Sequence, residues 1–240
     1  MNITSPLLKK MNYRLIFEEI HNSKKTSKSI LVQKLKLSLP TISKVLEELE
    51  AQGFIMKSGF GNPSGGRPST IYKFNERKKI SIVVNLHLNY INIALVDLCY
   101  EIVSEKTVSL YFENNEEYFM ALGATINNFI SETCSDSGAV LGVDIAIPGI
   151  ISENEENVIF SEILKTDNIK LSSFSEHIPY SCGFIHDAEA SAIAELHCGR
   201  GFENAFYIML NKYLCFSLIL GGKLIKSKGL SSGTLEHLVI

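Results

Sequence analysis

The sequence predicts an α/β protein in two parts, a basic helical domain over residues 1–79 and a larger mixed α/β domain over residues 80–240. With 240 residues, 45% of them hydrophobic, the chain is long enough for two cores. Residues 1–79 hold 15 Lys and Arg against 6 Asp and Glu, and the remainder holds 8 against 20, so the net charges are +9 and −12. Apolar spacing is helical in the first part and mostly strand-like in the second. A polyanion is the expected partner of the basic part, and a lysine-rich solvated surface is the alternative.

Three short helices are predicted in the basic part. The first places its apolar residues near one face, namely Leu8, Met11, Leu15, Ile16 and Ile20. Thr26 or Ser27 caps a second helix, and a third has Pro40 in its first turn and Gly53 at its end. The third helix carries an apolar stripe of Ile42, Val45, Leu46 and Leu49. Three helices with a tight turn before the last resemble a helix-turn-helix.

The polar face of the third helix supplies candidate DNA contacts. Hydroxyls and one lysine lie at its amino end, from Ser38, Thr41, Ser43 and Lys44, whereas its glutamates lie toward the far end. A recognition helix enters the major groove with its amino-terminal residues toward bases and phosphates, where carboxylates would be repelled. A plain three-helix bundle with a solvated face is the alternative.

A β-hairpin with a glycine-rich tip follows. The β-prone runs 54–56 and 71–74 flank GFGNPSGGRPS, which is typical of a wing. Its tip can bring the backbone at Gly66 close to DNA and insert Arg67 into a narrow A·T-rich minor groove. An interdomain hinge and a phosphate-cradling loop are the alternatives, and the second is disfavoured because no G-K-[ST] follows.

Residues 80–240 predict a mixed sheet with crossing helices. Strands are expected at 80–86, 91–98, 101–110, 139–147, 182–186, 205–210, 215–220 and 223–227, and helices at 117–133 and 188–199. No apolar run approaches the length of a membrane span, so no membrane partner is expected and the cytoplasm is the expected location. The five cysteines contain no C-x-x-C pair, which argues against a disulfide framework or a cysteine zinc site.

The order of motifs resembles the ROK transcriptional repressors, which are relatives of bacterial sugar kinases. The matching stretches are GGRPST at 65–70, IAIPGII at 145–151, HDAEASAIAE at 186–195 and GLSSGTLEHLVI at 229–240. The resemblance implies a winged helix-turn-helix followed by an actin-like (ribonuclease H-like) ATPase-type domain that senses or phosphorylates a sugar. It also implies that this chain is shortened at its carboxyl end, so that its second domain is partial.

The resemblance further implies a regulator that is not an enzyme. The two turns that carry phosphate-binding glycines in the family, here Asn85–Tyr90 and Asn211–Cys215, contain no glycine, so neither ATP nor another cofactor is expected. Asp187 matches the catalytic base of the kinases and is interpreted as a vestige of it, or as a cap of the helix at residue 188. A sugar kinase and a protein-interaction module are the alternative functions.

Ligand residues also come from the resemblance. His186, Asp187 and His237 match family sugar contacts, with Thr234 where glutamate is usual. His237 matches a zinc ligand as well, but one histidine cannot make a four-ligand structural site, so no metal is expected. The expected partners are double-stranded DNA, a sugar or sugar phosphate, and a second copy in a homodimer. The expected function is repression of genes for carbohydrate metabolism.

Overall fold

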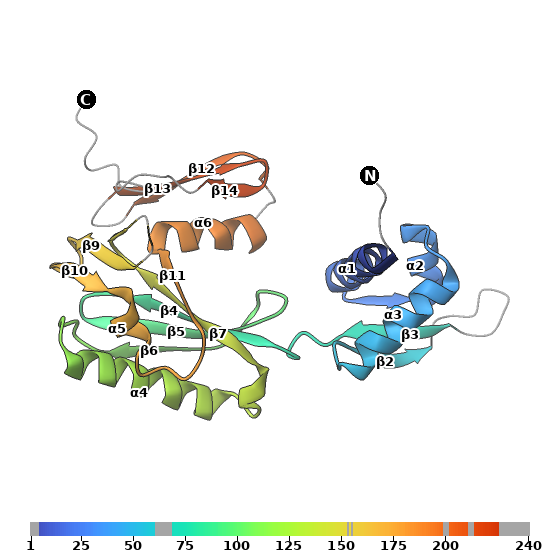
Figure 1. Cartoon of the computed structure of the whole chain (residues 1–240), viewed down its shortest axis with the longest axis horizontal. Coiled ribbons are helices and arrows are strands. Elements are labelled where there is room, and N and C mark those ends of the chain that lie inside the picture. Colours follow the sequence, from blue (N-terminus) through green and yellow to red (C-terminus); the bar gives the residue numbers. More distant parts are fainter. Residues whose placement is uncertain are drawn as a thin grey trace. The chain divides into compact units, whose positions relative to one another are not determined.

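A computed structural model describes residues 5–60, 69–152, 154, 156–198, 202–210 and 214–225 (Figure 1). The chain divides into two compact units, Met1–Lys78 and Lys79–Ile240. Several residues with predicted roles, namely Gly66, Arg67, Asn211–Tyr213, Thr234 and His237, lie outside the described residues.

Unit 1 contains three helices and a three-stranded antiparallel sheet. Its elements are α1 (Ser5–Ser23), β1 (Lys25–Ser27), α2 (Lys28–Leu35), α3 (Leu39–Ala51), β2 (Ile55–Phe60) and β3 (Thr70–Phe74). The strand order is β1-β3-β2. The helices bury a shared core of Ile16, Ile20, Leu31, Ile42, Leu46 and Leu49. Phe17 of α1 joins this core to the sheet, because its ring makes edge contacts with Phe54 and Phe74.

Side-chain caps set the turn between α2 and α3. The Oγ of Ser27 accepts a hydrogen bond from the Ile30 amide, which confirms the predicted cap of α2. Lys36 ends α2 in the left-handed conformation, with φ of 55°. Ser38 is the N-cap of α3. The chain therefore reverses between two well-capped helices within three residues.

The predicted apolar face of α1 is wrong for three of its five residues. Ile16 and Ile20 are fully buried, but Leu8, Met11 and Leu15 are about half exposed. Each residue turns a helix by about 100°, so Leu15 and Ile16 point in different directions. Ile16 and Ile20 therefore enter the core of unit 1, whereas the other three side chains remain on an exposed part of α1.

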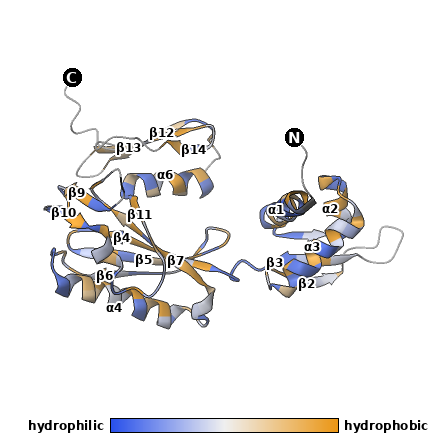
Figure 2. Ribbon diagram, in the orientation of Figure 1, coloured by the Kyte–Doolittle hydropathy of each residue, from blue (hydrophilic) through white to orange (hydrophobic). Residues whose placement is uncertain are grey.

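Unit 2 is built on a five-stranded mixed sheet of order β11-β7-β4-β5-β6. The elements involved are β4 (Ile80–Leu86), β5 (Tyr90–Asp97), β6 (Ile102–Ser109), α4 (Glu116–Thr133), the 3-10 turn η1 (Ser137–Ala139), β7 (Val140–Ile147) and β11 (Cys182–His186). β4, β7 and β11 run parallel, and β5 and β6 are antiparallel to their neighbours. Alternate residues of β4 and β5 are buried, and α4 covers one face of the sheet with its apolar side (Figures 1 and 2).

Two smaller sheets complete the described part of unit 2. The first, of order β10-β9-β8, comprises β8 (Ile150–Ile151), β9 (Asn157–Ser161) and β10 (Thr166–Lys170), and is followed by α5 (Leu171–Ser175). The second follows α6 (Asp187–Cys198) and comprises β12 (Ala205–Leu210), β13 (Leu214–Leu220) and β14 (Lys223–Ile225). No helix in the described residues is long and apolar enough to cross a membrane.

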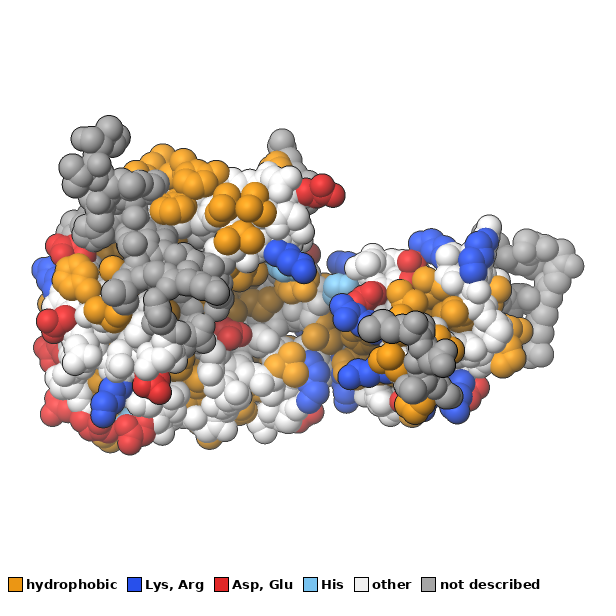
Figure 3. All heavy atoms as spheres, turned by 45° about the horizontal axis from the view of Figure 1, so that its top comes forward, with side chains coloured by type: hydrophobic (Ala, Val, Ile, Leu, Met, Phe, Trp, Pro, Cys, Tyr) orange, Lys and Arg blue, Asp and Glu red, His pale blue; other side chains and the backbone are white. Residues whose placement is uncertain are grey.

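The β12–β14 sheet packs one face against α6 and exposes the other. Cys215, Ser217 and Ile219 alternate along β13 as buried residues. The opposite face is apolar as well: Phe206 pairs with Leu218, and Ile208 with Phe216. Figure 3 shows hydrophobic side chains gathered over this part of the surface. Leu210 is the most exposed of them, with 84% of its surface accessible.

Candidate functional site

The amino end of α3 gathers four of the predicted DNA contacts. Ser38 is exposed, its Oγ accepts a hydrogen bond from the Thr41 amide, and it lies 2.8 Å from the Thr41 hydroxyl. Ser43 is half-buried and Lys44 is exposed. The first turn of α3 holds no acidic residue. This end of the helix is therefore a positive site, because the unpaired amides of the first turn and the lysine carry charge of the same sign.

The buried stripe of α3 fixes which way these polar side chains point. Ile42, Val45, Leu46 and Leu49 are all buried in unit 1, as predicted. Of the polar residues beside this stripe, Lys44 is exposed and Thr41 is half-buried. At the other end of the helix, Glu50 pairs with Lys57 of β2 at 2.9 Å. The charge at the acidic end of α3 is thus partly neutralised within unit 1, and the basic amino end remains available to bind an anion such as DNA.

A second candidate site lies where β11 meets α6. β11 ends at His186, and Asp187 is the first residue of α6, so both stand at the carboxyl end of three parallel strands. Open α/β sheets bind ligands at such strand ends. The Nδ1 of His186 lies 3.2 Å from Oδ1 of Asp187. The Ala188 amide donates to that same oxygen at 2.8 Å, which holds the carboxylate over the start of the helix.

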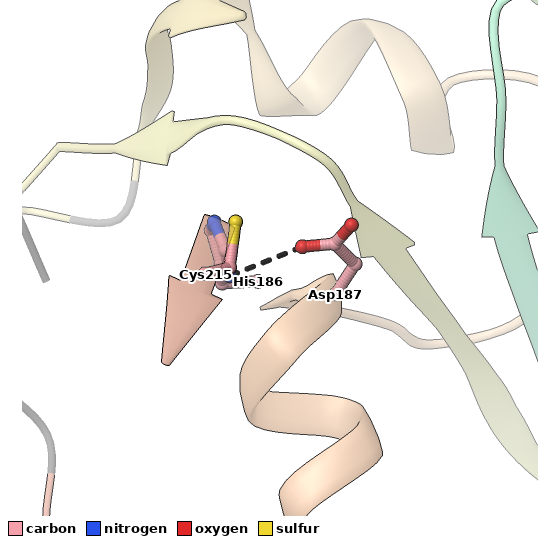
Figure 4. A group of neighbouring side chains, drawn as sticks. All are labelled: His186, Asp187 and Cys215. Atoms are coloured by element: carbon pink, nitrogen blue, oxygen red, sulfur yellow. Dashed lines mark ion pairs between the residues drawn. The ribbon is translucent and has the colours of Figure 1, made fainter. Parts of the chain in front are cut away.

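Two further residues reach this junction from distant parts of the sequence. Cys215 of β13 is buried, and one ligand-type atom from each of His186, Asp187 and Cys215 lies within 4.8 Å of the others (Figure 4). His87 comes from the turn between β4 and β5, and its ring stacks on Tyr90 with centroids 4.2 Å apart. Its Nε2 is buried and has no hydrogen-bond partner among the described residues.

Burial shifts the pKa values of two groups at the junction. Desolvation raises the pKa of Asp187 above its usual range, and the nearby His186, the Ala188 amide and His87 oppose this. Desolvation lowers the pKa of His87, and the charge of Asp187 opposes it. The carboxyl and the imidazole are therefore close enough to interact electrically, and both are pushed toward their neutral forms.

The structure also shows what fills the first of the two predicted phosphate turns. The His87 amide donates to the Tyr90 carbonyl at 3.0 Å, so Asn85–Tyr90 is a tight reversal between β4 and β5. The rings of His87 and Tyr90 stack on each other at this turn. Phosphate binding at a turn needs close approach to bare backbone, which glycine allows and such large side chains do not.

Sequence reasoning found His186 and Asp187, but it missed that Cys215 and His87 join them. From the sequence, His87 and Cys215 are assigned only to two turns that lack the family's phosphate-binding glycines. His186, Cys215 and His87 come from different strands or turns, and no short spacing in the sequence indicates that they lie close together. His237 and Thr234 lie outside the described residues.

Comparison with known proteins places the chain in a family. The model of the ROK family matches residues 82–240. The xylose repressor of Caldicellulosiruptor bescii is 25% identical over 240 residues, covering 98% of this chain and 60% of that protein. The chain spans about 60% of the length of such curated relatives.

Solved structures show the same fold. A structure described as a ROK family transcriptional regulator, a homologue of the E. coli MLC protein, is 20% identical with a TM-score of 0.70, covering 95% of this chain and 58% of that one. A Streptomyces griseus ROK family glucokinase in complex with glucose and AMPPNP is 20% identical with a TM-score of 0.55, covering 66% and 50%. Unit 2 therefore has the mixed α/β fold of ROK proteins, and the chain belongs to the ROK family.

Proposed function

We propose that this chain is a sugar-responsive transcriptional repressor that binds double-stranded DNA through unit 1. The observation that carries the proposal is the cluster of Ser38, Thr41, Ser43 and Lys44 at the amino end of α3. It offers hydroxyls and one cation at the positive end of a helix, within residues 1–79, whose net charge is +9. The name xylose repressor, carried by a relative matched over nearly the whole chain, supports the same function.

In the proposed complex, unit 1 acts as a winged helix-turn-helix. α2 and α3 are the helix-turn-helix, and the β2–β3 hairpin is the wing. α3 enters the major groove, with Lys44 on a phosphate and Thr41 and Ser43 toward base edges. Arg67, with Gly66 beside it, occupies the adjacent minor groove from the wing tip, where an A·T-rich sequence attracts a guanidinium.

Unit 2 is the proposed sensor. His186 and Asp187 stand at the carboxyl ends of parallel strands and offer an imidazole and a carboxylate to sugar hydroxyls, together with His237. The relative's name points to a pentose, and the glucokinase of similar fold holds a hexose. A sugar or sugar phosphate is therefore the ligand class, and we propose that the protein acts in the cytoplasm as a homodimer.

A sugar kinase is the second candidate, and the retained Asp187 and the glucokinase fold favour it. The first phosphate turn argues against it, because the rings of His87 and Tyr90 stack where the backbone should be open. We therefore propose that unit 2 does not catalyse phosphoryl transfer. Sugar-dependent ATP turnover that is lost in Asp187→Asn would reverse this assignment.

The test of DNA binding uses genomic fragments selected by the purified chain, with and without xylose and glucose. Binding to a selected duplex is then measured across salt concentrations for the wild type and for Lys44→Ala. Loss of one phosphate contact reduces the slope of log K against log salt by about one. Lys106→Ala is the matched control, because Lys106 is exposed, belongs to unit 2 and pairs with Glu132. An equal slope in wild type and Lys44→Ala would contradict the docking.

A further inference from the structure

The His186, Asp187 and Cys215 side chains at the β11–α6 junction have the chemistry of a metal site. They offer one imidazole nitrogen, one carboxylate oxygen and one thiolate, and these atoms all lie within 4.8 Å of one another (Figure 4). We propose that these three residues bind a divalent transition-metal ion, and that Zn²⁺ is the ion this ligand set favours. The proposal is independent of DNA binding by unit 1. With the ion bound, a sugar hydroxyl would reach the open position of the ion rather than His186 and Asp187 directly.

The spacing of the three groups fits a tetrahedral ion. Zn²⁺ lies about 2.0–2.1 Å from nitrogen and oxygen ligands and about 2.3 Å from sulfur, so neighbouring ligands of a tetrahedral site are about 3.3–3.6 Å apart. His186 Nδ1 and Asp187 Oδ1 are 3.2 Å apart. The sulfur of Cys215 is within 4.8 Å of its partners, so a side-chain movement of roughly 1 Å brings it to ligand distance.

The setting of these ligands favours a bound cation. His186 and Cys215 are only 6% and 5% exposed, and the carboxylate of Asp187 shares their enclosure. Buried charges are stabilised when they are paired or when they coordinate a metal. The Ala188 amide points at Oδ1 of Asp187, at 2.8 Å, and at Nδ1 of His186, at 3.2 Å. A carboxylate oxygen has two lone pairs, so Oδ1 can keep its bond to this amide and still bind the ion, and Nδ1 of His186 gives up its longer bond when the ion binds. The ligands also sit on β11, α6 and β13, which hold them in place.

His87 supplies an independent observation. Its Nε2 is buried without a hydrogen-bond partner among the described residues, and its charge interacts with that of Asp187. A buried nitrogen without a hydrogen-bond partner favours a polar group beside it, because an unsatisfied buried polar atom destabilises the folded protein. With three protein ligands, the ion keeps a fourth position for a water or a small ligand, as non-structural zinc sites do.

No spacing of ligand residues along the chain indicates this site. We expected no metal because the cysteines lack a C-x-x-C pair and because His237 stood alone. Here the ligands come instead from the β11–α6 junction and from β13, and the fold rather than local spacing brings them together.

The experiment uses the whole chain after chelation and removal of the chelator. Co²⁺ is added as a spectroscopic probe, because a thiolate ligand gives it a charge-transfer band in the near ultraviolet and a tetrahedral site gives intense visible bands. We expect one equivalent of Co²⁺ to bind with both signals, and Zn²⁺ to displace it. Cys215→Ser should abolish the thiolate band and weaken Zn²⁺ binding at least tenfold.

Controls keep the proposal falsifiable. Cys182→Ser changes the half-buried cysteine at the start of β11 and should leave the band intact, as should Cys198→Ser at the end of α6. His186→Asn and Asp187→Asn should each weaken Zn²⁺ binding at least tenfold. X-ray absorption on the Zn²⁺-loaded wild type needs no variant, and we expect one sulfur at about 2.3 Å with nitrogen and oxygen ligands near 2.0 Å. No thiolate band in the wild type, or a band that persists in Cys215→Ser, overturns the proposal.

Discussion

Ser38 has two roles at the start of α3: it caps the helix, and it lies where DNA is proposed to bind. Two substitutions of Ser38 distinguish these roles. In Ser38→Ala the Thr41 amide loses its acceptor and the Thr41 hydroxyl its 2.8 Å partner. Loss of such a cap costs about 1 kcal/mol. For a domain of this size, that lowers the midpoint of thermal unfolding by about 4–8 °C.

Ser38→Asp should change stability and DNA binding in opposite directions. Aspartate caps as well as serine does, and its charge is stabilising by about 0.3–1 kcal/mol at the positive end of a helix, so unit 1 keeps or gains stability. The same carboxylate stands against the phosphates of bound DNA. At about 4 Å in water-like surroundings this repulsion costs about 1 kcal/mol, which weakens binding about fivefold.

Two assays are needed. Circular dichroism follows thermal unfolding, and fluorescence anisotropy measures affinity for a selected duplex at two salt concentrations. The penalty in Ser38→Asp should shrink at the higher salt because the charges are screened. If Ser38→Asp bound DNA as tightly as the wild type, the amino end of α3 would not face phosphates. If both variants lost equal stability and equal affinity, the serine would act only through folding.

The remaining predictions concern the cores and the exposed sheet face. Leu46→Ala should cost about 2–5 kcal/mol, because Leu46 is fully buried, and calorimetry should show this loss only in the transition of unit 1. Burial raises the pKa of Asp187, so the folded state binds the proton more tightly than the unfolded state and stability falls as pH rises above about 4. Asp187→Asn in metal-free buffer should therefore unfold at a higher temperature than the wild type at pH 7, and the difference should vanish below about pH 4; a difference independent of pH would contradict this. Leu210→Lys should change stability by less than about 0.5 kcal/mol, because the side chain is 84% exposed, and should reduce association in light scattering.

Much of unit 1 could be predicted because its signals are local. The cap at Ser27 and the stripe of α3 follow from spacing within one or two turns, and both are found in the structure. The face of α1 was predicted wrongly because several of its residues are apolar and spacing alone does not say which of them meet a partner. Leu15 is half exposed although its neighbour Ile16 is buried.

The small β10-β9-β8 sheet was not predicted, and its composition explains why. β8 has two residues, β9 has a single run of three apolar residues between polar ones, and β10 has one apolar residue, Ile169. Such strands form because Val158 and Ile169 pack into the larger core, which is a tertiary effect. The junction was half predictable for a similar reason. His186 and Asp187 are adjacent in the chain, whereas Cys215 comes from the separate β12–β14 sheet and His87 from the turn between β4 and β5.

The turn closed by His87 and Tyr90 has a consequence for regulation. A sugar kinase converts the sugar that it binds into a sugar phosphate, so the fraction of its sites that hold sugar depends on turnover and on the supply of nucleotide. On the proposed function, the stacked side chains at the phosphate turn prevent ATP binding, so unit 2 binds the sugar without phosphorylating it. The fraction of sites beside Asp187 that hold sugar would then depend on the concentration of free sugar alone. The repressed genes would respond to that concentration rather than to the rate at which the sugar is phosphorylated.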